Sequence, residues 1–408
     1  MRILFVHQNF PAQYARVAPA LRERGHDIRV LIPTSNKRPE TYPTDRYEFN
    51  DGKVPERHAL ISHFAEHVRR GEAIGIAAEK LKTKGYVPDV ICGHLGWGET
   101  LFLKDVWPRA KLIVYAEFFY RNEGLDVGFD KEFAEYELAA SMRVTSRQAS
   151  LLLAMNSADL AQTPTQWQKE SFLAELQSKI RVVHEGIDTD VAQPQKTAFV
   201  KVGKGAQVTL RPGDEVLTFV NRNLEPYRGY HIFMRALPKI MARRKKARVI
   251  IVGGNDVSYG APPGLGRTWR DIFLAEVKDR LDMSRVHFVG QVPHGVFINL
   301  MQVSMVHAYL TYPFVLSWSM LEAMSAGAHV IGSRTPPVEE VIRAGKNGTL
   351  VDFFDVEGWA EAVIEGLAHP KKFTRLRESA RRTIVKRYDL KSVCLPQQVS
   401  LVESLHAP

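Results

Sequence analysis

The sequence has very little cysteine and no long apolar segment. Cys92 and Cys394 are the only cysteines among 408 residues, and neither has the Cys/His spacing of a zinc site or a redox motif. We therefore expect no disulfide framework and a reducing, cytoplasmic location. No apolar run approaches the roughly 20 residues that span a bilayer, and the run at 3–6 is too short for a signal peptide. Peripheral contact with an anionic inner membrane face stays open.

Acidic residues are outnumbered by basic ones, 45 against 55, which gives a formal net charge of +10. This excess favours an anionic partner without identifying it. The basic run at 243–246 lies at the end of a predicted helix, where cations complement the helix dipole, so we do not expect nucleic-acid binding. A composition of 45% hydrophobic and 25% charged residues is typical of globular domains and excludes disordered, collagen-like and coiled-coil proteins.

Short β-rich runs alternate with helical patterns along most of the chain, which is typical of βαβ units. The first half has predicted strands at 2–6, 27–32, 89–92, 111–115 and 180–184, with helices at 13–24, 146–154 and 165–176. The second half has predicted strands at 216–221, 249–252, 286–289, 305–310 and 330–333, with helices at 230–241, 319–326 and 360–388. We therefore expect an α/β protein with two doubly wound parallel sheets.

The two predicted domains are separated by a stretch rich in Gln, Pro, Lys and Gly that has no sustained period. We place the N-terminal domain at 1–190, a linker at 191–214 and the C-terminal domain at 215–388. A tail at 389–408 follows, and the sequence does not predict where it docks.

Three loops of the second half follow predicted strands, where ligands bind in doubly wound sheets, and the third is the turn at 332–340. The loop at 221–229 carries Arg222 and Arg228, which either bind a phosphate near the following helix N-terminus or are solvated. After the strand at 305–310, Ser319 and Glu322 have the spacing of a capping box. Alternatively, free N–H groups hold a diphosphate there while Glu322 accepts ribose hydroxyl hydrogens.

The order and spacing of several motifs resemble glycosyltransferase family 4, which comprises nucleotide-sugar-dependent, retaining enzymes of the GT-B fold. The motifs are Asn221-Arg222 through Arg228-Gly229, Ile251-Val252-Gly253-Gly254, Val289-Gly290, residues 321–327, and residues 338–342 with Asn347-Gly348. Residues 1–33 and the turn at 184–188 extend the resemblance to the first half. It implies two Rossmann-like domains with a cleft between them.

The resemblance implies donor contacts in the C-terminal domain. Arg222 and Arg228 would contact the donor diphosphate and act in catalysis, while Glu322 would hold the ribose. The further donor-binding residues are Asn221, Gly253, Leu316, Ser317, Trp318 and Ser319. The family often has a Glu-x7-Glu pattern, and here Phe314 stands at the first acid. Either other residues contact the sugar or activity has been lost.

The N-terminal domain of such enzymes binds the acceptor and contributes to catalysis. His94 matches a family histidine at a strand end, with a structural histidine as the alternative. Glu117 follows the strand at 111–115, where relatives often place a histidine close to the transferred sugar. The acceptor-binding residues implied by the resemblance are His7, Asn9, Phe10, Tyr120 and Arg121, and the aromatic ones are equally consistent with core packing.

The resemblance implies a metal-independent, retaining glycosyltransferase of the hexosyltransferase type. It would move a sugar from a nucleoside-diphosphate sugar to a hydroxyl of a glycan, lipid-linked or small-molecule acceptor, in polysaccharide or glycoconjugate synthesis. We expect no cofactor beyond this co-substrate, and arginines in place of a metal. Two alternatives remain: a catalytically silent nucleotide-sugar-binding scaffold, and a sugar-nucleotide epimerase with carboxylates and histidines near the donor loops.

Overall fold

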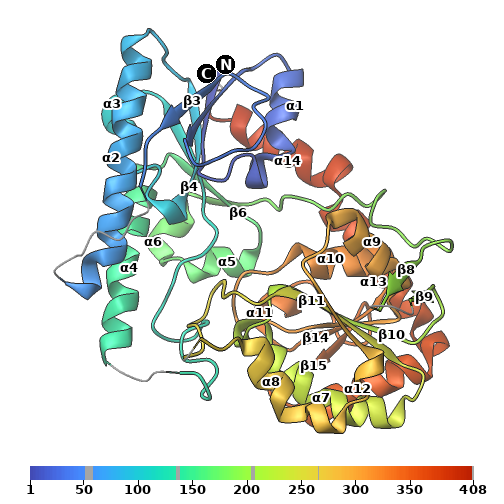
Figure 1. Ribbon diagram of the computed structural model, residues 1–408. Coiled ribbons are helices and arrows are strands. Elements are labelled where there is room, and N and C mark those ends of the chain that lie inside the picture. Colours follow the sequence, from blue (N-terminus) through green and yellow to red (C-terminus); the bar gives the residue numbers. More distant parts are fainter. Residues whose placement is uncertain (51–57, 135–137, 204–206, 265, 407–408) are drawn as a thin grey trace. The chain divides into compact units, whose positions relative to one another are not determined.

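The computed structural model describes residues 1–50, 58–134, 138–203, 207–264 and 266–406 (Figure 1). The chain divides into two compact units. Unit 1 comprises Met1–Gly186 and Lys391–Pro408, and unit 2 comprises Ile187–Leu390. Residues 204–206 of the predicted linker and the last two residues of the predicted tail lie outside the described residues.

Unit 1 is built on a parallel sheet with the strand order β3-β2-β1-β4-β5-β6-β7. Its strands are β1 (Arg2–Val6), β2 (Asp27–Pro33), β3 (Thr44–Tyr47), β4 (Val90–His94), β5 (Lys111–Tyr115), β6 (Leu160–Thr163) and β7 (Ile180–Val182). Phe5 of β1 is paired with Val30 of β2 and with Cys92 of β4. Strands covered on both faces are expected to be apolar throughout, and β1 is buried from Ile3 to Val6.

Helices cover both faces of the unit 1 sheet (Figure 1). They are α1 (Val17–Glu23), α2 (Ser62–Thr83), α3 (Leu103–Val106), α4 (Leu138–Ser157), α5 (Gln166–Ser171), α6 (Ala174–Gln177) and α14 (Leu395–Glu403), with 3-10 turns η1 (Ala12–Tyr14), η2 (Ala59–Ile61) and η3 (Leu95–Trp97). Leu4 packs in the core formed with α2 and α4, whereas Phe5 packs in the core formed with α1 and α14.

The C-terminal tail, whose docking the sequence did not predict, folds onto unit 1. Val399 and Val402 of α14 are buried in the core beneath α1. Glu403 accepts a hydrogen bond from Arg24 Nε at 2.7 Å and lies 2.8 Å from His26 Nε2. The first and last segments of the chain therefore belong to the same unit.

Unit 2 is built on a second parallel sheet with the order β12-β11-β10-β13-β14-β15. Its strands are β10 (Val216–Asn223), β11 (Arg248–Gly254), β12 (Val286–Gly290), β13 (Val306–Tyr309), β14 (His329–Ser333) and β15 (Thr349–Val351). Its helices are α7 (Tyr230–Arg243), α8 (Trp269–Val277), α9 (His294–Val303), α10 (Trp318–Ala326), α11 (Pro336–Glu339), α12 (Val356–Ala368) and α13 (Thr374–Tyr388), with turns η4 (Pro226–Arg228), η5 (Lys278–Arg280), η6 (Met283–Arg285) and η7 (Pro370–Phe373).

The segment predicted as a linker, 191–214, belongs to unit 2. In it, β8 (Val200–Val202) pairs antiparallel with β9 (Val208–Leu210). The apolar residues of these strands alternate with polar ones, and Val200, Val202 and Leu210 are buried in the unit 2 core. The described part of this segment is therefore packed structure, and the units divide after Gly186 and Leu390 rather than at 190 and 388.

Each sheet has a point where its strand order reverses. In unit 1, β1 lies between β2 and β4, and in unit 2, β10 lies between β11 and β13. Ligands of open α/β sheets bind beyond the carboxyl ends of the strands at such points. The loops after β1, β4, β10 and β13 are therefore the places to look for a site within each unit.

Candidate functional site

The loops after β10 and β13 meet through Arg228 in unit 2. Arg228 ends the turn η4 and is only 6% exposed. Its Nη1 donates to Thr311 Oγ1 at 2.8 Å and to the Val315 carbonyl at 2.9 Å. The next residue, Gly229, has φ +67°, and a Cβ there would lie 2.3 Å from Leu310 Cβ, so only glycine fits. Arg228 is therefore a buried cation at the reversal point of the sheet.

Aromatic rings enclose the Arg228 guanidinium. Its central carbon lies 5.1 Å from the ring centroid of Tyr259 and 5.8 Å from that of Phe314. Phe314 is 3% exposed and also packs on Tyr227, with ring centroids 5.5 Å apart. Phe314, which stands where relatives often have an acid, thus forms part of an apolar wall around the arginine.

The other residues of the loop after β10 are placed differently. Asn221 is half-buried, and the Arg222 side chain is exposed near the end of β10. Gly253 ends the buried part of β11 with φ +158°, and a Cβ there would lie 2.7 Å from Leu224 Cδ2. The sequence does not distinguish Arg222 from Arg228. In the structure, Arg228 is the one of the two whose side chain is buried within the loop.

The N-terminus of α10 is capped by Ser317, not by Ser319. Ser317 Oγ accepts the Ser319 N–H at 3.3 Å, and the Ser317 N–H donates to the Tyr309 hydroxyl at 2.8 Å. Glu322 therefore lies in the second turn and is too far along the helix to reach back to its N-terminus, so the predicted capping box is wrong. Its carboxylate is 2.7 Å from Nε2 of His294, at the start of α9.

The remaining predicted donor residues surround this helix start. Leu316 is buried, Ser319 is half-buried and Trp318 is 46% exposed. The first backbone N–H groups of α10 thus lie in the loop that Arg228 holds through Val315. Such a helix start favours anions because its N–H groups and dipole point outward.

A buried acid of unit 2, Glu225, was not predicted as a functional residue. It is fully buried, and its carboxylate accepts the backbone N–H groups of Ser258, Tyr259 and Gly260, each at 3.1 Å. Asn223 Nδ2 adds a bond of 2.8 Å to Ser258 Oγ. The loop after β11 is thereby tied to the loop after β10. A glutamate before a proline carries no sequence signal for such a role.

In unit 1, two histidines meet at the reversal point of the sheet. The ring centroids of His7, after β1, and His94, at the end of β4, are 5.6 Å apart. Nδ1 of each ring accepts the backbone N–H two residues ahead, from Asn9 and Gly96, at 2.9 Å. This contact places the proton of the neutral ring on Nε2.

Both histidines are neutral at pH 7. Burial, with a contribution from the Arg38 charge, lowers the pKa of His7 to about 4. Burial also lowers the pKa of His94 well below its usual range. His94 Nε2 lies 3.9 Å from a carboxylate oxygen of Glu117, which is half-buried. The structure thus brings together His7, His94 and Glu117, each with a polar group that can contact a sugar hydroxyl.

Glu99 and Arg70 were not predicted and hold the loop after β1. Glu99 is fully buried, and its carboxyl group accepts the Gln8 N–H. Arg70, on α2, donates to the Gln8 side-chain oxygen and pairs with Glu66 at 2.9 Å. Burial raises the pKa of Glu99 to about 8, although the Gln8 N–H and the Arg70 charge act in the opposite direction.

The predicted acceptor residues divide between exposed and packed positions. Asn9 is exposed, whereas Phe10 is buried against Phe5, with ring centroids 5.8 Å apart. Tyr120 packs under the Arg147 guanidinium at 4.5 Å. Arg121 Nη2 donates to the Phe172 carbonyl at 2.8 Å. The aromatic residues and Arg121 therefore have packing or structural contacts within unit 1.

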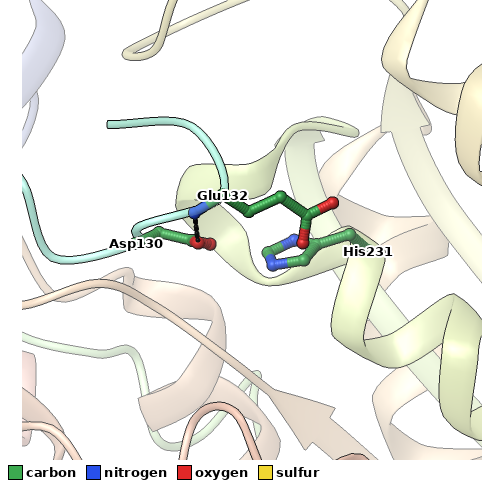
Figure 2. A group of neighbouring side chains, drawn as sticks. All are labelled: Asp130, Glu132 and His231. Atoms are coloured by element: carbon green, nitrogen blue, oxygen red, sulfur yellow. Dashed lines mark hydrogen bonds between the residues drawn. The ribbon is translucent and has the colours of Figure 1, made fainter. Parts of the chain in front are cut away.

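Figure 2 shows Asp130, Glu132 and His231, whose carboxylate and imidazole groups are of the types that bind metals. Oδ1 of Asp130 accepts the Glu132 N–H at 3.0 Å, which forms a local turn. Asp130 and Glu132 belong to unit 1 and His231 to α7 of unit 2, so we assign no metal site to them.

No helix in the described ranges is both long enough and apolar enough to cross a membrane.

Comparisons with known proteins agree with the two-unit architecture. A model of the glycosyl transferase family 4 group matches residues 24–192, and a model of glycosyl transferases group 1 matches residues 204–383. D-inositol 3-phosphate glycosyltransferase of Mycobacterium ulcerans is 29% identical over 198 residues, which cover 47% of this chain and 37% of that protein. The same enzyme of Mycobacterium avium is 28% identical over 47% of this chain and 42% of its own length. The chain thus spans less than half the length of these curated relatives.

Solved structures match over nearly the whole chain. Sucrose-phosphate synthase from Thermosynechococcus elongatus has a TM-score of 0.72 at 18% identity, with 99% of both chains covered. HepE from Anabaena, in complex with UDP and glucose, has a TM-score of 0.65 at 16% identity, with 99% of both chains covered. These likenesses show the GT-B fold. The chain belongs to the group 1 glycosyltransferases of family 4.

Proposed function

We propose that this protein is a metal-independent, retaining glycosyltransferase that transfers a sugar from a nucleoside-diphosphate sugar to an acceptor hydroxyl. The observation that carries the proposal is the buried Arg228 at the reversal point of the unit 2 sheet, next to the N-terminus of α10. A buried, fixed cation beside the positive end of a helix dipole is suited to a diphosphate leaving group.

Unit 2 would hold the donor. When the sugar leaves, negative charge builds on the diphosphate, and Arg228, Arg222 and the start of α10 would stabilise it without reorganising. A permanently charged guanidinium can replace a divalent metal in this role. Glu322, in the second turn of α10, would accept hydrogen bonds from the donor ribose.

Unit 1 would supply the groups that face the acceptor. His7 and His94 are neutral rings that each carry a proton on Nε2, so both can donate to sugar or acceptor oxygens. Glu117, beside His94, can accept a hydroxyl hydrogen. Cytoplasmic glycan or glycoconjugate synthesis is the process that we propose for this activity.

UDP-sugars are the first donors to test, because HepE was solved with UDP and with UDP-glucose. A second candidate function is donor binding without transfer. It is motivated by Phe314, whose buried ring occupies the position of the family's first acid. Such a protein would bind a nucleotide sugar and release no nucleoside diphosphate.

A ligand screen followed by an activity assay tests the proposal. The purified protein is heated with UDP-, GDP-, ADP- and dTDP-sugars in EDTA, and any donor that raises Tm is then assayed for nucleoside diphosphate release. We expect stabilisation by one donor class and release in EDTA. Stabilisation without release, with or without acceptor sugars, would favour the binding-only candidate. Absence of binding, even after Mg²⁺ is restored, would contradict both.

A further inference from the structure

We propose that Glu225 is a positioning residue that fixes the loop after β11, and that this loop presents Tyr259 as part of the donor-binding surface. The proposal deepens the proposed function and rests on it only for the ligand measurements. Glu225 lies within the 221–229 motif but is not a residue to which the resemblance gives a role, and Tyr259 lies outside the motifs.

The first observation is the way in which Glu225 holds the loop. The carboxylate is fully buried at the end of β10, and both of its oxygens accept backbone N–H groups of Ser258, Tyr259 and Gly260. A buried carboxylate with three N–H partners makes charge-assisted bonds, which are stronger than neutral ones. Losing the charge would weaken all three contacts together. Asn223 Nδ2 adds a fourth contact to the same turn, through Ser258 Oγ.

The second observation is the contact that this anchoring produces. Tyr259 is 39% exposed, and its ring lies 5.1 Å from the Arg228 guanidinium carbon and 4.9 Å from the Phe314 ring. The Arg228 side chain also donates from Nη1 to Thr311 and Val315. Tyr259 is thus the exposed member of the ring pair that packs on the proposed diphosphate-binding arginine.

Glu225 provides charged anchors for a loop whose described residues lack regular structure, which makes Glu225 important for the order of this loop. Between β11 and α8 the described residues form neither helix nor strand. Besides the contacts to Glu225 and Asn223, Trp269 Nε1 donates to the Ala261 carbonyl at 3.1 Å at the far side of the turn. We infer that without Glu225 the segment around Tyr259 loses its fixed position while the sheet keeps its own bonds.

Amide hydrogen exchange of the full-length protein tests the positioning role directly. The variant Glu225→Gln keeps the size of the side chain and removes its charge. We expect exchange at residues 258–260 to accelerate by about tenfold or more, with protection of β10 and β13 unchanged. The matched control is Glu215→Gln, which removes a half-buried ion pair to Arg244 at the opposite end of β10. It should leave exchange at 258–260 unaltered.

Calorimetric titrations with UDP, ADP and GDP test the role of Tyr259. For whichever of these binds the wild-type protein, we expect Glu225→Gln and Tyr259→Ala to raise Kd by about fivefold or more. Tyr259→Phe keeps the ring over Arg228 and removes the hydroxyl, which also hydrogen-bonds with the guanidinium, so its Kd should lie between those of the wild type and Tyr259→Ala.

Unchanged exchange at 258–260 in Glu225→Gln, or acceleration throughout unit 2, would overturn the positioning role. Wild-type affinity in Tyr259→Ala would overturn its place in the donor surface. If the wild-type protein binds none of the three nucleotides, the proposed function and the donor role of Tyr259 fail, whereas hydrogen exchange still decides whether Glu225 fixes the loop.

Discussion

Arg222 and Arg228 lie in one loop, and their sequence context does not distinguish a solvated side chain from a buried one. The structure separates them: Arg222 is exposed, and Arg228 is buried among aromatic rings. Burial depends on residues distant in sequence, here Tyr259 and Phe314, which single-sequence reasoning cannot bring together. The buried Glu225 went unpredicted for the same reason.

The role of Glu322 can be tested because it does not cap its helix. We predict that Glu322→Ala raises the donor Kd by about tenfold, since a charge-assisted bond to the ribose is lost. The Tm should change little, because the Ser317 cap remains. Calorimetry and a thermal melt of the same sample measure both quantities. The control is His294→Ala, which removes the partner of Glu322 but no proposed donor contact. Wild-type donor affinity in Glu322→Ala, with a lowered Tm, would indicate a purely structural residue.

At the scale of elements, strong apolar runs were predicted well and weakly periodic segments were not. The predicted strands 2–6 and 111–115 have the same bounds as β1 and β5. The long helix α2 was not predicted, because buried His67, Arg70 and Gly71 interrupt its apolar stripe. The edge strand β3 was missed because most of its residues are polar.

The helix α14 provides a test at this scale, because it packs the C-terminal tail onto unit 1. We predict that Val402→Asp destabilises unit 1 by about 3 kcal/mol or more, since it places a charge in the core beneath α1. Chemical unfolding followed by circular dichroism measures the change. The neighbouring control Glu403→Gln weakens a partly exposed ion pair and should cost about 1 kcal/mol or less. Equal, small effects of both variants would show that α14 does not stabilise unit 1.

At the scale of the whole molecule, the alternation of strands and helices was sufficient to predict two parallel α/β halves. It was not sufficient to locate their boundaries. The polar composition of 191–214 does not predict the short hairpin formed there by β8 and β9, because the hairpin is buried only against the unit 2 core. The return of the chain to unit 1 depends on α14 fitting against α1, which is a tertiary contact. Local sequence patterns carry no information about either packing event.

The lowered pKa values of buried histidines allow a prediction of how the stability of the protein depends on pH. Burial lowers the pKa of His67 and His307 to about 3 and that of His184 and His329 to about 4, as for His7. Each ring is neutral in the folded protein. Its contribution to the free energy of unfolding is therefore fully present above the unfolded pKa near 6.5 and is lost as the pH falls through the folded pKa. We predict that Tm falls steeply from pH 6.5 to 4, which thermal melts in constant ionic strength measure. A flat Tm over this range would contradict the buried, neutral state of these rings.

The central claim is that Arg228 stabilises a nucleoside diphosphate leaving group without a metal. The most direct test is the rate of nucleoside diphosphate release in EDTA, measured for the wild type, Arg228→Lys, Arg228→Ala and the control Arg235→Ala, which breaks an exposed pair to Glu276 on α8. We predict that Arg228→Ala lowers the rate by about a hundredfold or more, that Arg228→Lys falls in between, and that Arg235→Ala matches the wild type. A folded Arg228→Ala variant with the wild-type rate, or release only when Mg²⁺ is present, would contradict the claim.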